Sequence, residues 1–286
     1  MWIADNWKDY EVLDTGSGEK LERWGDYLLV RPDPQVIWKS DRKNPGWRKK
    51  NGHYHRSAKG GGEWEFFNLP EEWSIHYRDL TFHLKPFSFK HTGLFPEQAV
   101  NWDWCSDIIK KSDRPLKVLN LFAYTGGATI SAAKAGANVT HVDASKGMVN
   151  WARENAAASG LSEAPIRWLV DDCVKFVERE IRRGNTYDGI IMDPPSYGRG
   201  PKGEIWKIEE SIFPFVQLCT QLLSHDAKFF LINSYTTGLQ PAVLNYMMNL
   251  CITPTFGGQV EADEIGLPVK DTGLVLPCGA SGRWCR

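Results

Sequence analysis

Residues 117–237 alternate between short apolar runs and longer amphipathic stretches. The apolar runs lie at 117–123, 138–144, 166–172, 187–193 and 228–234 and are typical of strands. Helix-like stretches lie between them at 128–134, 146–158, 174–183 and 208–223, and another follows at 241–250. Strands that alternate with helices predict parallel strands joined by right-handed crossovers, and nearly continuous apolar strands indicate a sheet covered on both faces. We therefore predict an α/β fold with a doubly wound sheet, closed by an antiparallel pair of strands at 259–269 and 274–284.

Residues 1–100 show a different pattern, with short extended pieces between Gly, Pro and Asp turns. Two runs at 73–77 and 80–84 alternate at period two and predict a hairpin that turns at Arg78-Asp79. A basic loop is expected at 39–62, because residues 39–59 carry eight Lys or Arg against one acidic residue and end at three glycines. We predict a small, mainly β N-terminal domain at 1–100 and a second domain at 101–286.

Composition excludes some classes of function. The 34 Lys and Arg against 35 Asp and Glu give a net charge of −1, which excludes a polycation held to nucleic acid by bulk charge. The hydrophobic fraction of 42% excludes global disorder. Locally, however, the basic residues of the loop are interleaved with Trp38, Trp47 and Tyr54, a pattern that suits looped RNA. The alternative is a solvated loop without a partner.

Six cysteines are present, and none forms a CxxC pair. We expect reduced thiols in a cytoplasmic protein, without a signal peptide or a membrane span. His53 and His55 have no Cys or acidic residue at metal-ligand spacing, so we expect no metal site.

Four predicted strand ends carry candidate binding residues. The strand at 117–123 runs into a turn, Phe122-Ala123-Tyr124-Thr125-Gly126, in which glycine allows the backbone to approach a ligand closely. Asp143 ends the next strand and is placed to accept both hydroxyls of an adenosine ribose. Asp172 ends the third strand and could reach an adenine amino group. The alternatives are a tight turn and two helix-capping carboxylates.

The fourth strand ends in Asp193-Pro194-Pro195-Ser196-Tyr197. Two consecutive prolines continue neither a ladder nor a helix, so they predict a rigid loop. Such a loop can hold an acid and carbonyl groups at fixed distances from a target atom, and Tyr197 offers a stacking face for a planar group. In the segment that follows, Arg199 and Lys202 could meet phosphate and Trp206 could stack on a base. The alternative is a surface loop with a docked Trp.

Together these motifs resemble class I S-adenosylmethionine-dependent methyltransferases, and most closely the bacterial large-subunit rRNA methyltransferases that modify cytosine C5 or guanine N7. The segment Lys90–Ala99 is similar to that family's Thr-Gly-x-Phe-x-Asp-Gln-Arg element, although Glu97 replaces the Asp and Ala99 the Arg. The resemblance covers residues 80–284 and implies a seven-stranded, Rossmann-like methyltransferase sheet with S-adenosyl-L-methionine as cofactor. It implies catalytic roles for Asp193, Pro194, Pro195 and Tyr197. It implies a cofactor site formed by Thr92, Phe95, Gln98, Phe122, Ala123, Tyr124, Thr125, Gly126, Asp143, Ala144, Ser145, Asp171, Asp172 and Asp193.

One departure from the family bears on the chemistry. Cytosine C5 is a poor nucleophile until a thiolate adds to the ring, and the C5 enzymes of this family carry a Cys after the fifth strand. Tyr235 stands at that position here, and Cys173 and Cys219 are predicted core thiols. We therefore predict methylation of RNA, by analogy ribosomal RNA, at a ring nitrogen, an exocyclic amine or an oxygen rather than at C5. The alternatives are a methyltransferase for a small molecule or protein side chain, and a non-catalytic cofactor- or RNA-binding module. The sequence leaves the oligomeric state open.

Overall fold

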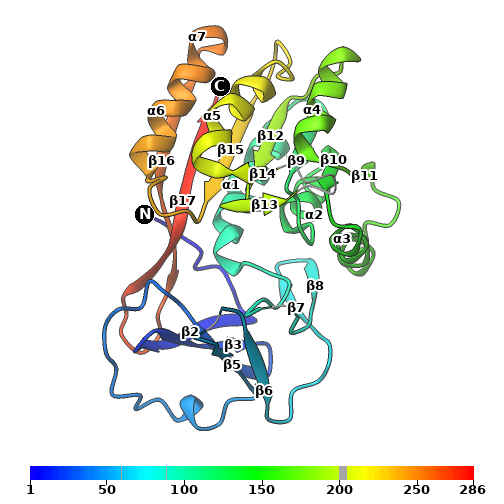
Figure 1. Ribbon diagram of the computed structural model, residues 1–286. Coiled ribbons are helices and arrows are strands. Elements are labelled where there is room, and N and C mark those ends of the chain that lie inside the picture. Colours follow the sequence, from blue (N-terminus) through cyan, green and yellow to red (C-terminus); the bar gives the residue numbers. More distant parts are fainter. Residues whose placement is uncertain (59, 88, 200–204) are drawn as a thin grey trace. The chain divides into compact units, whose positions relative to one another are not determined.

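The computed structural model describes residues 1–58, 60–87, 89–199 and 205–286 (Figure 1). The chain forms two compact units. The α/β unit comprises Met1–Trp2, Val100–Ile265 and Gly279–Arg286, and the β unit comprises Ile3–Ala99 and Gly266–Cys278. Each unit therefore includes segments that are far apart in the sequence. Among the described residues, no helix is both long and apolar enough to cross a membrane.

The α/β unit is built on an eight-stranded sheet, counted over the described part of the chain. Its order is β1 (Trp2–Ile3), β16 (Gln259–Pro268), β17 (Val275–Cys285), β15 (Phe229–Ser234), β12 (Gly189–Met192), β9 (Lys117–Leu121), β10 (Asn138–Asp143) and β11 (Ile166–Val170). The five strands from β15 to β11 pair in parallel, and β17 pairs antiparallel with β15. The predicted doubly wound sheet is confirmed, and the short β1 is an added edge strand.

Helices cover both faces of this sheet. Successive residues of each strand point to opposite faces, and apolar side chains on both faces pack against helices. Leu119, Ile190 and Phe230 pack toward α4 (Cys173–Arg182), α5 (Ile208–Thr220) and α6 (Pro241–Cys251). Val118 and Leu231, which point to the other face, pack with α1 (Ala99–Lys111) and α2 (Gly127–Lys134). The helix α3 (Lys146–Ala158) contacts α2, and the short α7 (Thr253–Phe256) follows α6. Burial on both faces explains why most strand residues are apolar, and polar exceptions such as Asn120, Thr140 and His141 are themselves buried.

The β unit contains a five-stranded sheet in the order β2 (Tyr10–Gly16), β3 (Glu19–Trp24), β4 (Tyr27–Pro32), β5 (Gly52–Arg56) and β6 (Gly62–Phe66). The predicted hairpin is present as β7 (Trp73–Tyr77) and β8 (Leu80–Leu84). Two short 3-10 helices, η1 (Pro45–Trp47) and η2 (Pro96–Gln98), complete the unit.

The sequence prediction of a loop throughout 39–62 is wrong. Residues 52–56 form β5, which pairs in parallel with β4 and antiparallel with β6. Trp47 is buried, and its indole nitrogen donates to Asp14 Oδ2 at 2.7 Å. Six of the eight basic residues lie at 39–50, before β5, and only Arg56 lies within the strand, so the density of basic residues did not indicate where the strand lies. Lys59, the last basic residue of the segment, lies outside the described residues.

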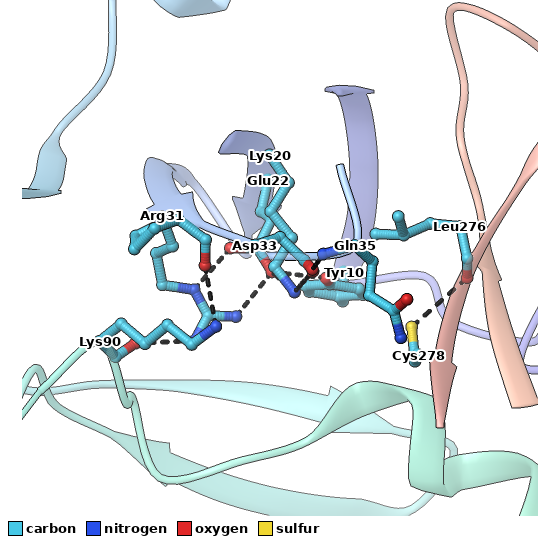
Figure 2. A network of polar contacts seen from close by, with 10 residues as sticks. Tyr10, Lys20, Glu22, Arg31, Asp33, Gln35, Lys90, Leu276 and Cys278 are labelled. Carbon is cyan, nitrogen blue, oxygen red and sulfur yellow. Dashed lines mark hydrogen bonds and ion pairs between the residues drawn. The ribbon is translucent and has the colours of Figure 1, made fainter. Parts of the chain in front are cut away.

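A network of ion pairs and hydrogen bonds lies in the interior of the β unit (Figure 2). The buried Glu22 carboxylate receives two hydrogen bonds from Arg31, at 2.6 and 2.7 Å, and one from the Tyr10 hydroxyl at 2.7 Å. Lys20 lies 3.3 Å from Asp33. Burial by itself would raise the pKa of Glu22, but the charges of Arg31 and Lys20 and the hydrogen bonds outweigh burial and lower this pKa to about 2. The carboxylate thus stays ionised inside the unit.

Candidate active site

The predicted site residues of the α/β unit lie at or after the carboxyl ends of β9, β10, β11 and β12, four neighbouring strands of its sheet (Figure 1). Four loops follow the carboxyl ends of β9, β10, β11 and β12, and parallel pairing brings these ends to the same edge. The order of the strands reverses at β9, since β10 lies on one side of it and β12 on the other. Ligands of open α/β sheets bind at such a reversal point.

The turn after β9 has an unusual backbone. Phe122 and Tyr124 have φ values of 55° and 53°, and Gly126 has 86°. A bulky residue in the left-handed region costs about 1–3 kcal/mol and persists only where neighbours fix it. Here Asp143 accepts a hydrogen bond from the Tyr124 amide at 2.9 Å. A Cβ at position 126 would lie 2.8 Å from the Ala152 Cβ, so glycine is required for the approach to α3.

Asp143 connects the strand β10 to this turn. Besides the Tyr124 amide, its carboxylate accepts the Ser145 amide at 2.8 Å. Burial raises the pKa of Asp143, and these two amides partly offset the increase. A half-buried carboxylate held by two backbone amides is rigid, and its remaining lone pairs can accept ligand hydroxyls.

The loop after β12 contains the Asp-Pro-Pro motif. Asn233, at the end of β15, donates its amide to Asp193 Oδ1 at 3.0 Å. The Pro195 carbonyl accepts the Trp206 indole N–H at 2.7 Å, and the Trp206 ring packs 5.3 Å from that of Phe122. Tyr197 is 51% exposed. Trp206 is therefore docked against the loop, whereas Tyr197 offers a free ring face at its rim.

The loop continues into a short antiparallel pair, β13 (Tyr197–Arg199) and β14 (Ile205–Lys207). Arg199 Nε donates to the Tyr197 hydroxyl at 2.9 Å. Lys202, expected to meet phosphate, lies outside the described residues together with the rest of 200–204.

A chain of buried polar side chains leads from Arg283 to Asp193. The Arg283 guanidinium donates to Asn101 Oδ1 at 2.8 Å, and Asn101 Nδ2 donates to Ser281 Oγ at 2.9 Å. Ser281 donates to Asn233 Oδ1 at 2.8 Å, and Asn233 donates to Asp193. Every donor points from the cation toward the carboxylate, so the dipoles are aligned and each amide has one allowed orientation.

The motifs of the sequence did not reveal this chain. Its members come from α1, β15 and β17, which are distant in sequence. The available signal was weak: polar residues at positions 233, 281 and 283 inside otherwise apolar strands. Buried polar groups need partners, so such positions indicate an internal hydrogen-bond network without specifying its members.

Comparison with known proteins shows the family. A family model for S-adenosylmethionine-dependent methyltransferases matches residues 44–206. The chain belongs to this family. The crystal structure of a SAM-dependent methyltransferase from Agrobacterium tumefaciens superposes with a TM-score of 0.92 at 38% identity, covering 99% of this chain and 93% of that one.

Curated relatives of this methyltransferase include enzymes named ribosomal RNA large subunit methyltransferase K/L. The one from Pseudoalteromonas atlantica is 36% identical over 237 residues, which cover 73% of this chain and 32% of the relative. The one from Cellvibrio japonicus is 31% identical over 182 residues, covering 62% and 21%. The chain thus spans about a third or less of the length of these relatives.

The residues at the sheet edge fit S-adenosyl-L-methionine, the cofactor of the family. The left-handed turn at 122–126 leads into the start of α2, where amide groups favour an anion such as the cofactor carboxylate. Asp143, with Ala144 and Ser145 beside it, is suited to hydroxyls of the ribose. The assignment of these residues to the cofactor remains a prediction.

Asp171 and Asp172 have clear structural tasks. Asp171 forms an ion pair with Arg179, and Asp172 caps α4 by accepting the Lys175 amide at 2.9 Å. The capping alternative is therefore realised for Asp172. A cap uses one carboxylate oxygen, and the adenine contact stays a prediction.

Thr92, Phe95 and Gln98 belong to the β unit. Phe95 precedes η2, and Gln98 is its last residue. The Thr92 hydroxyl is buried and has no hydrogen-bond partner among the described residues. A buried hydroxyl of this kind indicates a position that a ligand can complete. The role of the three residues in cofactor binding stays a prediction.

The two thiols nearest the motifs are buried in the core. Cys173 begins α4, and its sulfur accepts the Phe122 amide at 3.3 Å. Cys219 lies inside α5 with no exposed surface. Burial raises the pKa of both thiols well above the usual range. Both therefore have the properties of core thiols rather than of nucleophiles, which act as exposed thiolates.

Proposed function

We propose that this methyltransferase modifies RNA, by analogy with its relatives ribosomal RNA, at a ring nitrogen or an exocyclic amine. The observation that supports this proposal is the loop at 193–197, which presents Asp193 and the exposed ring of Tyr197 without a reactive thiol. Tyr235, at the end of β15 where C5 enzymes carry Cys, is 38% exposed. Two tyrosine rings at one sheet edge suit the faces of an unstacked base. We place this activity in the cytoplasm, where thiols such as the six free cysteines stay reduced.

Nitrogen methylation requires little from the protein beyond position and proton removal. The cofactor supplies an electrophilic methyl group on a sulfonium. Asp193, oriented by Asn233, accepts a hydrogen bond from the target amine and so directs the nitrogen lone pair. The Pro194 and Pro195 rings restrict the backbone of the loop and so hold its carbonyl groups at a constant distance from the target atom. Alignment of this kind can supply about 7–11 kcal/mol of the barrier reduction.

The β unit supports an RNA substrate through its basic and aromatic side chains. Trp38 is 40% exposed at the start of the basic segment, and Phe66 and Phe67 are exposed at the end of β6. The Lys50 ammonium lies 5.3 Å from the Phe67 ring centroid. Aromatic faces beside cations bind single-stranded nucleotides without strong sequence preference. Trp47 is buried and does not take part.

The direct test transfers labelled methyl groups from S-adenosyl-L-methionine into separate RNA, protein and small-molecule fractions of a strain that lacks the gene. We expect label in RNA, and nucleoside mass spectrometry should assign it to a nitrogen. The Asp193→Asn variant is the matched control, because it keeps the size of the side chain and removes the charge. Label confined to protein or to small molecules would overturn the proposed substrate.

The thiol-independent mechanism has its own test. We expect the Cys173→Ala and Cys219→Ala variants to retain methyl transfer within about tenfold of wild type, since loss of a true nucleophile costs several orders of magnitude. Any smaller decrease would follow from the cavities left in the core. Abolished turnover in a folded variant, together with methylation at carbon, would contradict the proposal.

A further inference from the structure

Two histidines and two glutamates converge on one face of the β-unit sheet. His53 Nε2 lies 2.6 Å from Glu19 Oε1, and His55 Nε2 lies 2.8 Å from Glu65 Oε2. The two imidazole rings are 3.9 Å apart. One ligand atom each from His53, His55 and Glu65 lie within 4.8 Å of one another. Spacing along the sequence, which offered no acidic residue at metal-ligand distance, therefore missed these partners.

Strand geometry explains why spacing along the sequence missed this cluster. His53 and His55 are two residues apart in β5, so they point to the same face. Glu65 is the register partner of His53 in the neighbouring β6. Glu19 belongs to β3, on the other side of β4. Three strands thus contribute to one set of nitrogen and oxygen donors.

We propose that His53, His55 and Glu65, with Glu19 as a fourth donor, form a binding site for a first-row transition-metal dication of the Zn²⁺ type. Two imidazoles with carboxylates form a donor set of this class. With bonds of about 2.0–2.1 Å, tetrahedral Zn²⁺ holds its donor atoms about 3.3 Å apart. The donor atoms of His53, His55 and Glu65 lie within 4.8 Å of one another, so side-chain rotations of about 1.5 Å bring them to this spacing. Glu19 joins them through its contact of 2.6 Å with His53 Nε2.

The existing hydrogen bonds are compatible with this proposal. In each His–Glu pair the nitrogen and the oxygen already lie within 2.8 Å of each other, facing the place where a cation would bind both. Arg42 donates to the other oxygen of Glu19 at 2.6 Å, which fixes this carboxylate toward His53. The half-exposed His55 leaves a path by which an ion can enter.

A bound ion would tie the outer hairpin to the sheet. Four of the five residues of β6 are exposed, and the strand pairs only with β5 on its inner side within the described residues. A metal bridge from β3 to β5 and β6 would stabilise this edge. The site is distinct from the cofactor residues and does not rest on the proposed RNA substrate.

The test titrates Zn²⁺ into the chelator-treated full chain by calorimetry. We expect one ion per chain, and at least about 100-fold weaker binding in the His53→Gln/His55→Gln double variant, because losing even outer partners of a metal ligand costs 10–100-fold. Zn²⁺ should also raise the unfolding temperature of wild type and not of the double variant. The control is His76→Gln, which removes an exposed histidine paired with Asp9 at 3.0 Å.

Three results would overturn the proposal. The first two are the absence of stoichiometric binding to wild type and undiminished binding to a folded double variant. Co²⁺ spectra supply the third test, since thiolate ligands give intense charge-transfer bands that an imidazole–carboxylate site does not. Appearance of these bands at one equivalent would assign the ion to a cysteine site instead.

Discussion

Asp143 shows how one side chain can serve both structure and binding. Its carboxylate fixes the left-handed turn through the Tyr124 amide and the following loop through the Ser145 amide. The sequence located it because it ends a strand next to a glycine turn. The sequence did not show that the same oxygens hold the strained backbone in place.

Replacing Asp143 with Ala should weaken binding of S-adenosyl-L-methionine by about 1–3 kcal/mol, the scale for losing a charged hydrogen-bonded group. Calorimetry on the folded variant measures the change. Asp143→Asn is the matched control, since it keeps one acceptor oxygen and should lose less affinity. Equal affinity of the Ala variant and wild type would remove Asp143 from the cofactor site.

Asp193→Ala should lower kcat far more than cofactor affinity, because its proposed contact is to the target amine.

Ser281→Ala breaks the polar chain at its middle and leaves Asn101 and Asn233 without their shared partner. We expect a smaller loss of kcat in this variant, about 10–100-fold, the range for groups that orient a reacting residue. Separate measurement of kcat and of cofactor affinity distinguishes the two effects. Equal loss of both in Asp193→Ala would assign Asp193 to cofactor binding or folding.

At the scale of elements, the apolar runs predicted the central strands of the α/β unit, whereas the pattern of the basic segment did not predict β5. The strand predicted at 138–144 is present as β10, and the helix at 146–158 coincides with α3. Burial of apolar side chains stabilises both elements, and the spacing of apolar residues in the sequence indicates which side chains are buried. β5 is stabilised by pairing with strands on both sides while it carries polar side chains, so only its neighbours determine its structure.

The start of β12 depends on an ion pair that can be tested by pH. Asp188 accepts hydrogen bonds from Arg114 at 2.8 and 2.9 Å, from the Lys117 amide and from Ser224. Burial alone would raise the pKa of Asp188, but these bonds lower it to about 2. A carboxyl pKa below the unfolded value of about 3.9 adds stability above that pH, and this stability is lost as pH falls toward 2.

Arg114→Gln should therefore lower the free energy of unfolding by about 1 kcal/mol at pH 7, a modest value because Arg114 is half exposed. The difference from wild type should shrink between about pH 4 and 2, where Asp188 becomes protonated. Urea denaturation at pH 7, 5 and 3 measures it. The exposed Arg182 provides the control variant Arg182→Gln, and a difference that grows on acidification would contradict the assignment.

At the scale of the whole molecule, the units are discontinuous in sequence. Residues 266–278 belong to the β unit, where Lys270 N donates to the Val12 carbonyl at 2.9 Å and Asp271 N to the Leu13 carbonyl at 3.0 Å. The change in the pattern of apolar and polar residues suggested a domain boundary at residue 100. Such a change marks where one pattern ends. It cannot show that residues 266–278 pair with the β unit, because contacts between residues distant in sequence determine that pairing.

A fragment comprising residues 1–99 should consequently be less stable than the β unit of the full chain. It lacks the backbone hydrogen bonds to Val12 and Leu13 and the Asn44–Asp271 contact of 2.8 Å. Addition of a synthetic peptide of residues 266–278 should increase amide protection in β2, as measured by hydrogen exchange. Protection in the fragment alone equal to that of the full chain would contradict this expectation.

The returning segment has a consequence for biogenesis. During synthesis the amino-terminal residues leave the ribosome first, and domains usually fold in that order. Here residues 3–99 of the β unit reach their full stability only after residues 266–278 are made, by which time Val100–Ile265 has already been made. The α/β unit can therefore acquire most of its sheet while the other unit still lacks its final segment. Chaperones that protect a nascent chain would then be needed longest at its amino-terminal end.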